Sequence, residues 1–406
     1  MKILLALPGP LFPADTGGKI RTLNIFSRLA KSAEVHAVSF ADPLLDTSAI
    51  ATMRAAFASY TPVFRSEVKK YSPRFYREVI ANQFASLPYF LAKCNHSHFR
   101  SAVQQLLCGK HFDLLFCDFL QTAVPLLNCA FTPKVVFEHN VEFLLRKRKW
   151  EVEGNRLRKF IFGSEWRKTR AIEAEVCRSF DHVIAVSPED QGVLQREFGI
   201  EEVSILPAGV DLDFFSPRES QSDPGRIVFV GSMDWDPNED GVLWFVREIY
   251  PRIRREVPSA RFTIVGRSPS SRLCAIAGQK QGIEITGRVA DVRSYISQSE
   301  VVVVPLRVGG GTRIKIPEAM AMGKAVVSTP LGAEGLRFKA GQEICIAGSP
   351  DLFSQAVVQL LKNSSLRSSI GVAARQAAIK HSWTHVVSQL ETILQRVALL
   401  GERVAA

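Results

Sequence analysis

Short apolar runs alternate with helical stretches along most of the chain. The runs are rich in β-branched residues and lack strict polar alternation, which is typical of buried parallel strands. In the first half they are Ile3–Leu7, Val35–Ser39, Leu114–Cys117, Val135–Phe137, His182–Val186 and Val203–Leu206. In the second half they are Ile227–Gly231, Phe262–Val265, Ile283–Ile285, Val301–Val304, Ala325–Ser328 and Glu343–Ile346. Strands that alternate with helices predict an α/β protein built from parallel βα units.

Two domains are expected from this repetition. Residues 50–108 carry few strand signals and predict a helical excursion, interrupted by prolines. The segment 216–226 is polar, with two prolines and a glycine, and is typical of a linker. We therefore predict a first domain over 1–220, a second over 221–382, and a C-terminal segment 383–406 with a helix over Trp383–Val397.

Basic residues are densest between Arg146 and Arg170, where ten Lys or Arg stand against three Glu. Leu157, Phe160 and Ile161 follow a helical spacing there and predict one amphipathic helix with a basic face. Two interpretations remain open at this point. The basic face is either the solvated side of a structural helix or a surface that docks on an anionic membrane. The stretch from Lys69-Lys70-Tyr71 to Arg77 is a second candidate of the latter kind.

The segment 301–330 holds the most specific chemistry. The strand Val301–Val304 is followed by three glycines, a polar turn and a short helix opened by Pro317-Glu318. Glycines between a strand and a helix bring backbone N–H groups to an anion, and the helix N-terminus adds a favourable partial charge. Arg313 offers a planar fork for phosphate oxygens and Lys315 a compact charge, while Glu318 could accept hydrogen bonds from a ribose diol. Together these groups predict a sugar-nucleotide site.

The sequence resembles glycosyltransferase family 4, and the resemblance extends along nearly the whole chain. The segments that carry it, besides the glycine loop, are Ile3–Gly18, Val135–Glu142, Leu206–Phe215, Val228–Asn238, Phe262–Gly266 and Ile285–Val289. The resemblance implies a GT-B fold, with two Rossmann-like doubly wound parallel-sheet domains facing across a cleft. It also implies a retaining transfer of a sugar from a nucleoside diphosphate donor, with a UDP-sugar favoured.

The resemblance also assigns roles to individual residues. His139 matches the family's active-site histidine and would orient the sugar, while Arg313 and Lys315 would stabilise the departing diphosphate. The donor-binding residues would be Gly17, Gly18, Arg288, Val289, Gly310, Gly311, Thr312 and Glu318. The acceptor would be a saccharide or a lipid-linked saccharide, in polysaccharide or glycolipid biosynthesis.

The chain departs from the family pattern at the donor site. The family usually has two glutamates eight positions apart, and here Gly310 stands at the first position and Glu318 at the second. The loop Gly231–Pro237 lacks the Arg and Lys that often bind the diphosphate. We expect Arg313 and Lys315 to supply those charges from the neighbouring loop.

Other nucleotide and metal motifs are weak. Gly17-Gly18-Lys19 fails as a kinase-type phosphate loop because Pro13 stands where a glycine is required. Asp211 and Asp213 have the Asp-x-Asp spacing but lie before the linker, where turn or cap roles are expected. We therefore predict chemistry without a metal or other cofactor. Two rivals remain, a nucleotide-sugar epimerase of the same fold and a non-catalytic basic nucleic-acid-binding protein.

Composition sets broad limits on the protein. The chain has 406 residues and a formal net charge of +11, with the basic excess spread over both halves. Seven cysteines without a Cys-x-x-Cys pair indicate a reducing compartment. The apolar start Met1–Leu7 is interrupted at Pro8 and is typical of a first strand rather than a signal peptide. We expect a cytoplasmic protein, with a peripheral position on the inner membrane face left open, and no nucleic-acid partner.

Overall fold

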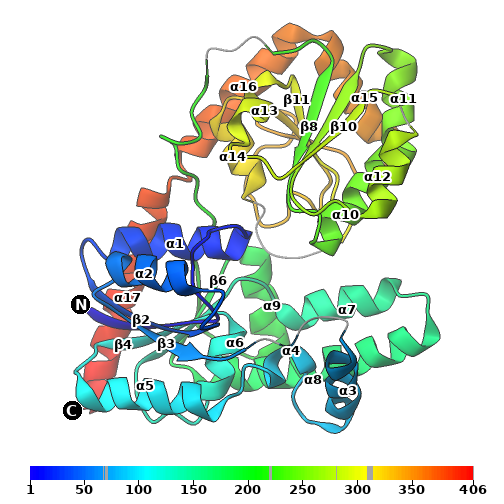
Figure 1. Cartoon of the computed structure of the whole chain (residues 1–406). Coiled ribbons are helices and arrows are strands. Elements are labelled where there is room, and N and C mark those ends of the chain that lie inside the picture. Colours follow the sequence, from blue (N-terminus) through cyan, green and yellow to red (C-terminus); the bar gives the residue numbers. More distant parts are fainter. Residues whose placement is uncertain (67, 69–71, 219–221, 280, 309–313, 406) are drawn as a thin grey trace. The chain divides into compact units, whose positions relative to one another are not determined.

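Two parallel sheets organise the chain (Figure 1). The computed structural model describes residues 1–66, 68, 72–218, 222–279, 281–308 and 314–405. Residues 1–207 and 386–406 form one compact unit, and residues 208–385 form a second. The sequence analysis placed the division at residues 220 and 221, whereas the chain leaves the first unit after Pro207.

The first unit is built on a parallel sheet of seven described strands in the order β3-β2-β1-β4-β5-β6-β7. Its strands are β1 (Lys2–Leu7), β2 (Glu34–Ala41), β3 (Ser59–Phe64), β4 (Leu114–Asp118), β5 (Lys134–Glu138), β6 (His182–Ala185) and β7 (Val203–Ile205). The central strands are buried on both faces, as continuous apolar runs require. Because all strands are parallel, the carboxyl ends of β4 and β5 lie at the same edge.

Helices cover both faces of this sheet (Figure 1). They are α1 (Gly17–Leu29), α2 (Thr47–Ala56), α3 (Pro73–Ala81), η1 (Asn82–Phe84), α4 (Tyr89–Ala92), α5 (Ser97–Gly109), α6 (Leu120–Ala123), η2 (Val124–Leu126), α7 (Glu142–Val152), α8 (Arg156–Ser179) and α9 (Pro188–Phe198). The last helix, α17 (Trp383–Ala405), belongs to this unit from Val386 onward. Its Arg396 donates to Ser204 Oγ at 3.4 Å.

The structure corrects two predictions in this unit. The segment β3 was assigned to a helical region, but it pairs with β2 at the edge of the sheet, where Pro62 is tolerated because an edge strand has one free side. The predicted single helix over 146–170 is two helices, α7 and α8. They are separated at Glu153–Asn155, where Asn155 caps α8 by accepting from the N–H groups of Leu157 and Arg158 at 3.1 Å.

The second unit is built on a parallel sheet of six described strands in the order β10-β9-β8-β11-β12-β13. Its strands are β8 (Arg226–Val230), β9 (Arg261–Val265), β10 (Ile283–Gly287), β11 (Val301–Val304), β12 (Ala325–Ser328) and β13 (Cys345–Ile346). The last strand is shorter than the predicted run Glu343–Ile346. The α/β class with parallel sheets, predicted from the apolar runs, is confirmed.

Helices also cover both faces of the second sheet. They are α10 (Asp236–Trp244), the π-helical turn η3 (Phe245–Ile249), α11 (Tyr250–Glu256), α12 (Ser271–Gly278), α13 (Arg293–Gln298), α14 (Lys315–Ala321), α15 (Pro350–Lys362) and α16 (Ser364–Ile379). Pro317 lies in the first turn of α14, where its missing N–H has no intrahelical partner to lose. Gly323 follows with φ 71° and ends the helix, as predicted.

Within the described residues, none of the helices combines enough length and apolar character to cross a bilayer.

Candidate functional site

In the first unit, Asp118 and His139 meet at the carboxyl ends of β4 and β5. His139 Nε2 lies 2.7 Å from Asp118 Oδ1, and both side chains are buried. The other carboxylate oxygen of Asp118 accepts from Thr22 Oγ1 of α1 at 2.8 Å. Neighbouring parallel strands bring these residues together, since β4 and β5 pair in register up to Asp118 and Phe137.

This contact selects the tautomer of His139. A carboxylate only accepts, so Nε2 carries the proton and Nδ1 keeps its lone pair. Nδ1 is buried and has no hydrogen-bond partner among the described residues. Burial lowers the pKa of His139 below its ordinary value, against the opposing effect of Asp118. The imidazole is therefore neutral at pH 7 and presents a hydrogen-bond acceptor at Nδ1.

Phe119 holds the imidazole from one side. Its ring is stacked on His139 with centroids 3.8 Å apart and planes inclined by 11°. Its backbone has φ 70°, a conformation that costs a non-glycine residue free energy and is concentrated at functional sites. A Cβ atom at Gly18 would lie only 2.6 Å from Phe119 Cζ. The predicted residues Gly18 and His139 thus both lie against the ring of Phe119.

Arg21 belongs to the same site, because its charge acts on both Asp118 and His139. It is buried, its Nε has no described partner, and burial lowers its pKa to about 10 although Asp118 and Asp190 favour the charged form. A buried cation beside an acceptor nitrogen is suited to an anionic or polyhydroxyl ligand. The sequence analysis did not identify Arg21, Asp118 or Phe119. Asp118 could have been found, because it directly follows the predicted strand Leu114–Cys117.

Three buried glutamates lie next to this site, namely Glu138, Glu142 and Glu173. Glu173 accepts from the N–H groups of Glu142 and Phe143 at 2.8 and 2.7 Å, which caps the first turn of α7. Burial raises the pKa of Glu173 to about 8, and burial with the nearby carboxyls Glu173 and Glu142 raises the pKa of Glu138 well above its ordinary value. The pKa of Glu142 is also raised by burial, against the opposing effect of Arg146, so this dry site favours the protonated form of each carboxyl.

In the second unit, Lys315 points from α14 to the loop that follows β8. Its Nζ lies 2.7 Å from Asn238 Oδ1 and 4.2 Å from the centroid of Phe229. A Cβ atom at Gly231 would lie 2.7 Å from the same nitrogen. Lys315 therefore brings its charge to the loop Gly231–Pro237, which has no basic residue of its own. This is where the sequence analysis expected the replacement charge.

A second cation reaches the same loop from β9. Arg267 Nε donates to Ser232 Oγ at 2.8 Å and lies 3.3 Å from Asp234 Oδ2. The backbone makes this approach possible because Gly266 lies against Gly231, whose carbonyl oxygen would be 1.8 Å from a Cβ at Gly266. The sequence analysis missed Arg267, although it lies two positions after the predicted strand Phe262–Val265.

Some of the remaining residues predicted to bind the donor lie within the described part of the chain, and others lie outside it. Burial raises the pKa of Glu318 to about 8, with Lys315 opposing the shift. At the end of β10, Arg288 is exposed, while Val289 packs against the core of the unit. Nucleotide binding by these residues stays a prediction. Gly310, Gly311, Thr312 and Arg313, with Gly309, lie outside the described residues.

Asp211 takes the turn role expected for it. Its Oδ1 accepts from the N–H groups of Asp213 and Phe214, at 3.2 and 2.9 Å. This carboxylate thus stabilises a local turn.

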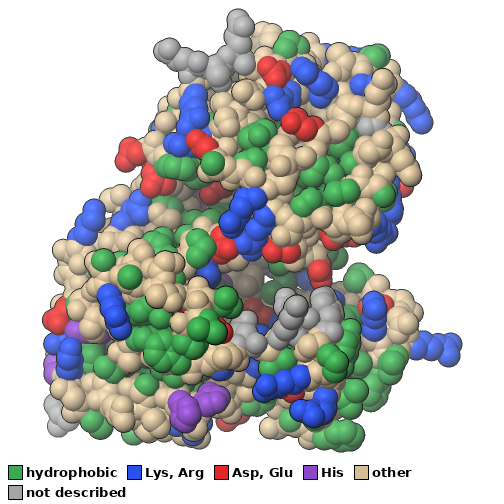
Figure 2. Space-filling view, in the orientation of Figure 1, with side chains coloured by type: hydrophobic (Ala, Val, Ile, Leu, Met, Phe, Trp, Pro, Cys, Tyr) green, Lys and Arg blue, Asp and Glu red, His purple; other side chains and the backbone are tan. Residues whose placement is uncertain are grey.

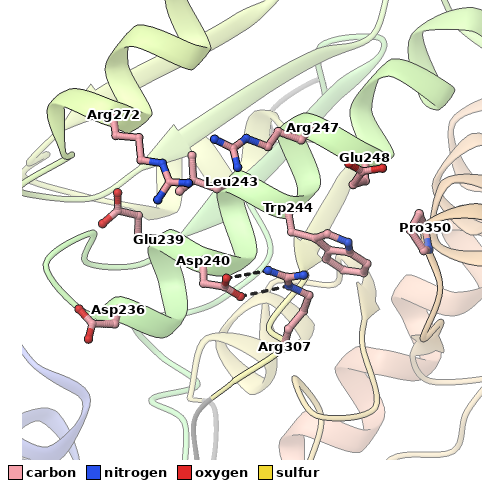
Figure 3. Close-up of a pocket in the computed structure, with 10 residues that line it drawn as sticks. All are labelled: Asp236, Glu239, Asp240, Leu243, Trp244, Arg247, Glu248, Arg272, Arg307 and Pro350. Atoms are coloured by element: carbon pink, nitrogen blue, oxygen red, sulfur yellow. Dashed lines mark hydrogen bonds and ion pairs between the residues drawn. The ribbon is translucent and has the colours of Figure 1, made fainter. Parts of the chain in front are cut away.

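A cavity of about 680 Å³ lies along α10 and η3 (Figure 3). Arg307 crosses it, with two nitrogens at 3.1 and 2.6 Å from the Asp240 carboxylate and its guanidinium 5.4 Å from the Trp244 ring. Four acidic and three basic side chains line the cavity, so most of its charges are balanced. None of the predicted donor residues that the structure describes lines this cavity.

Comparison with known families agrees with the two-unit architecture. Residues 61–214 match the model of Glycosyltransferase Family 4, and residues 224–363 match that of Glycosyl transferases group 1. The chain belongs to glycosyltransferase family 4. It is a transferase with the GT-B fold, and the family predicted from the sequence is confirmed.

Individual relatives are distant. An uncharacterized 44.6 kDa protein in the cps region of Klebsiella pneumoniae is 21% identical over 66% of this chain and 70% of its own. The phosphatidyl-myo-inositol mannosyltransferase of Mycobacterium tuberculosis is 27% identical, and the match spans 54% of this chain and 61% of that enzyme. The structure of Anabaena Alr3699/HepE in complex with UDP and glucose has a TM-score of 0.71 and 14% identity, covering 98% of this chain and all of that one. This last likeness shows the fold alone.

Proposed function

We propose that this glycosyltransferase moves a hexose from a nucleoside diphosphate-sugar, with UDP favoured, to a saccharide or lipid-linked acceptor, with retention and without a metal ion. The observation that carries the proposal is Lys315, whose Nζ lies against Gly231 and Asn238 at the carboxyl edge of the second sheet. Ligands of doubly wound sheets bind at this edge. The bound UDP in the fold relative Alr3699/HepE supports the choice of nucleotide.

In this proposal the second unit binds the nucleotide. Lys315 and Arg267 stabilise the negative charge of the departing diphosphate, a contribution that a divalent metal supplies in other enzymes. Glu318 accepts hydrogen bonds from the ribose hydroxyls, and the main chain at Arg288 and Val289 contacts the base. Arg313 and the glycines before it add to the phosphate cradle, as the sequence analysis expects.

The first unit contributes groups for the sugar. His139 Nδ1 accepts a hydrogen bond from a sugar hydroxyl and thereby fixes the orientation of the ring. The bond from C1 to the diphosphate oxygen breaks, and the bond from C1 to the acceptor oxygen forms on the same face of the sugar. The acceptor's proton passes to the departing diphosphate oxygen, so no protein base is required. The protein works at the inner membrane face, in the assembly of a cell-surface polysaccharide or glycolipid.

A donor screen followed by product analysis tests this function. Thermal shifts with UDP-, GDP-, ADP- and dTDP-sugars identify the donor, and NMR of the product gives the anomeric configuration. We expect one UDP-sugar to stabilise the protein, and transfer with retention that persists in EDTA. Isomerisation of the donor without an acceptor would instead indicate an epimerase. Salt-sensitive nucleic-acid binding with no response to any sugar nucleotide would refute the proposal.

A further inference from the structure

Large apolar side chains are exposed on two neighbouring elements of the first unit. One element is α3 with η1, and the other is the turn from α7 to α8. The exposed fractions are 53% for Tyr76, 65% for Ile80, 92% for Phe84, 68% for Val152, 70% for Leu157 and 72% for Phe160. Single exposed apolar residues are ordinary, but a group of this size indicates an interaction surface.

Specific contacts hold η1 and the start of α4 against the middle of α8. Lys168 Nζ of α8 donates to the carbonyl oxygens of Asn82 and Gln83 in η1, at 2.8 and 2.9 Å. Glu165 of α8 accepts from the N–H of Tyr89, at 3.0 Å. Phe160 precedes Glu165 on α8 by less than two turns, or roughly 8 Å along the axis. The elements α3 and η1 therefore lie beside α8 in the first unit, and the turn from α7 to α8 is at the far end of that helical pair (Figure 1).

Exposed basic side chains accompany these apolar groups along the same elements. Arg77, Lys149, Arg156 and Arg158 are exposed on the same elements. Figure 2 shows blue Lys and Arg side chains among green hydrophobic ones over the lower right part of the molecule, where α3, α7 and α8 lie. The acidic residues of these elements have local partners, since Glu78 is paired with Arg74 at 3.0 Å, Glu151 is paired with Lys147 at 4.0 Å, and Glu153 accepts from the N–H of Asn155. The region thus combines apolar anchors with a positive surface.

We propose that this docking surface, formed by Tyr76, Ile80, Phe84, Val152, Leu157 and Phe160 with Arg77, Lys149, Arg156 and Arg158, binds an anionic lipid bilayer. Apolar side chains would enter the boundary between headgroups and acyl chains, and the basic ones would contact anionic headgroups. Either contribution alone gives weak and reversible binding, so a stable attachment requires both.

The chemistry of the surface favours a bilayer over the other polyanions. A nucleic acid binds through its phosphates and through bases stacked on aromatic rings. Tyr76, Phe84 and Phe160 could stack in this way, but the exposed aliphatic side chains Ile80, Val152 and Leu157 would gain nothing from such a ligand, whereas a bilayer buries both kinds. An acidic protein would need pockets that match side chains on two separate elements. A bilayer accepts any apolar side chain that reaches it. The proposal is independent of the transfer reaction, because lipid binding needs neither donor nor acceptor.

Vesicle flotation tests the docking surface. The full-length protein is mixed with vesicles of phosphatidylcholine, with or without phosphatidylglycerol, at low and at high salt. We expect flotation with the anionic vesicles only, weakened by salt. The double variants Leu157→Ser/Phe160→Ser and Arg156→Ser/Arg158→Ser should each lower the lipid partition coefficient by roughly tenfold or more.

Matched variants separate docking from general effects. Leu352 and Val372 are exposed by 58% and 62% in the second unit, so Leu352→Ser/Val372→Ser controls for lost surface hydrophobicity. Lys31→Ser/Lys110→Ser removes two exposed charges elsewhere in the first unit. Both controls should float like the unchanged protein, and all variants should keep its melting temperature and its thermal shift with the preferred sugar nucleotide.

Three results would overturn the proposal. The first is equal flotation with neutral and anionic vesicles, and the second is flotation unchanged in both docking-surface variants. The third is tight binding of RNA or an acidic polypeptide that depends on Arg156 and Arg158 but not on Leu157 and Phe160, without any binding to anionic vesicles. Since the donor response is measured separately, a failure here leaves the proposed transfer reaction intact and removes only the placement at the inner membrane face.

Discussion

The ring of Phe119 lies parallel to the imidazole of His139, with 3.8 Å between the ring centroids. The same ring lies against the Cα of Gly18, where a methyl group would stand 2.6 Å from Cζ. A substitution at Gly18 must therefore move Phe119, and the imidazole that Phe119 covers would lose its support. Gly18, which the sequence predicts to contact phosphate, therefore also keeps His139 in position.

Gly18→Ala should lower kcat by about tenfold or more and destabilise the protein by about 1–3 kcal/mol through overpacking. Gly9→Ala is the matched control, because no atom lies within 4 Å of a Cβ there. Phe119→Leu in the Gly18→Ala background should recover part of the stability, since the smaller side chain makes room. Urea unfolding and steady-state kinetics measure both effects. Equal behaviour of the Gly18 and Gly9 variants would exclude the steric argument.

Asp118→Asn tests the tautomer of His139. The amide can donate to Nε2, which would move the imidazole proton to Nδ1 and remove the acceptor. We expect kcat to fall by about ten- to a hundredfold, while the KM for the donor changes little. The nitrogen chemical shifts of His139 report the tautomer directly. Retention of full kcat with a changed tautomer would show that Nδ1 has no role as an acceptor.

Lys315→Ala should weaken UDP binding by roughly ten- to a hundredfold, since a hydrogen bond to a charged group contributes about 1.5–3 kcal/mol. Lys362→Ala removes an exposed lysine of the same unit and serves as the control. Calorimetric titration with UDP and with uridine separates the phosphate contribution from the nucleoside. A loss of affinity that is equal for both ligands would contradict the diphosphate role.

Glu318 should make nucleotide binding depend on pH. Its pKa is raised to about 8 by burial, so the carboxyl is mostly protonated in the free protein at pH 7. A carboxylate that accepts two ribose hydroxyls favours the ionised form, so UDP binding should release a proton and tighten as pH rises from about 6 to about 8. Calorimetry in two buffers of different ionisation enthalpy measures the release. Glu318→Gln should abolish it, and a release that persists in this variant would assign the proton to another group.

The same raised pKa has a consequence for stability. Since the folded protein holds the proton of Glu318 more tightly than the unfolded chain does, its contribution is fully present below the ordinary glutamate pKa. The contribution is lost as pH rises through about 8. Thermal melts between about pH 6 and pH 9 should show a smaller loss for Glu318→Gln than for the unchanged protein. Glu175→Gln, at an exposed position, should melt like the unchanged protein throughout.

The prediction of one amphipathic helix over 146–170 was incomplete, and the exposure of two of its apolar residues shows why. Leu157 and Phe160 have the spacing of a helix that packs on a core, yet both are exposed near the start of α8. Periodicity shows that apolar residues share a helix face, but it does not show what that face contacts. The break at Glu153–Asn155 was also missed, because the signals of one short turn are weak beside a long basic run.

The sequence by itself determined the parallel α/β architecture, the family and the segment that carries Lys315 and Glu318. These follow from local patterns, namely apolar runs, glycine clusters and the order of residues within one strand-loop-helix unit. Only the tertiary structure decided that Asp118 holds His139, 21 positions away, and that Arg267 and Lys315 reach the same loop. Such pairs arise because parallel strands distant in the chain end at one edge of a sheet, and their spacing in sequence carries no record of that meeting.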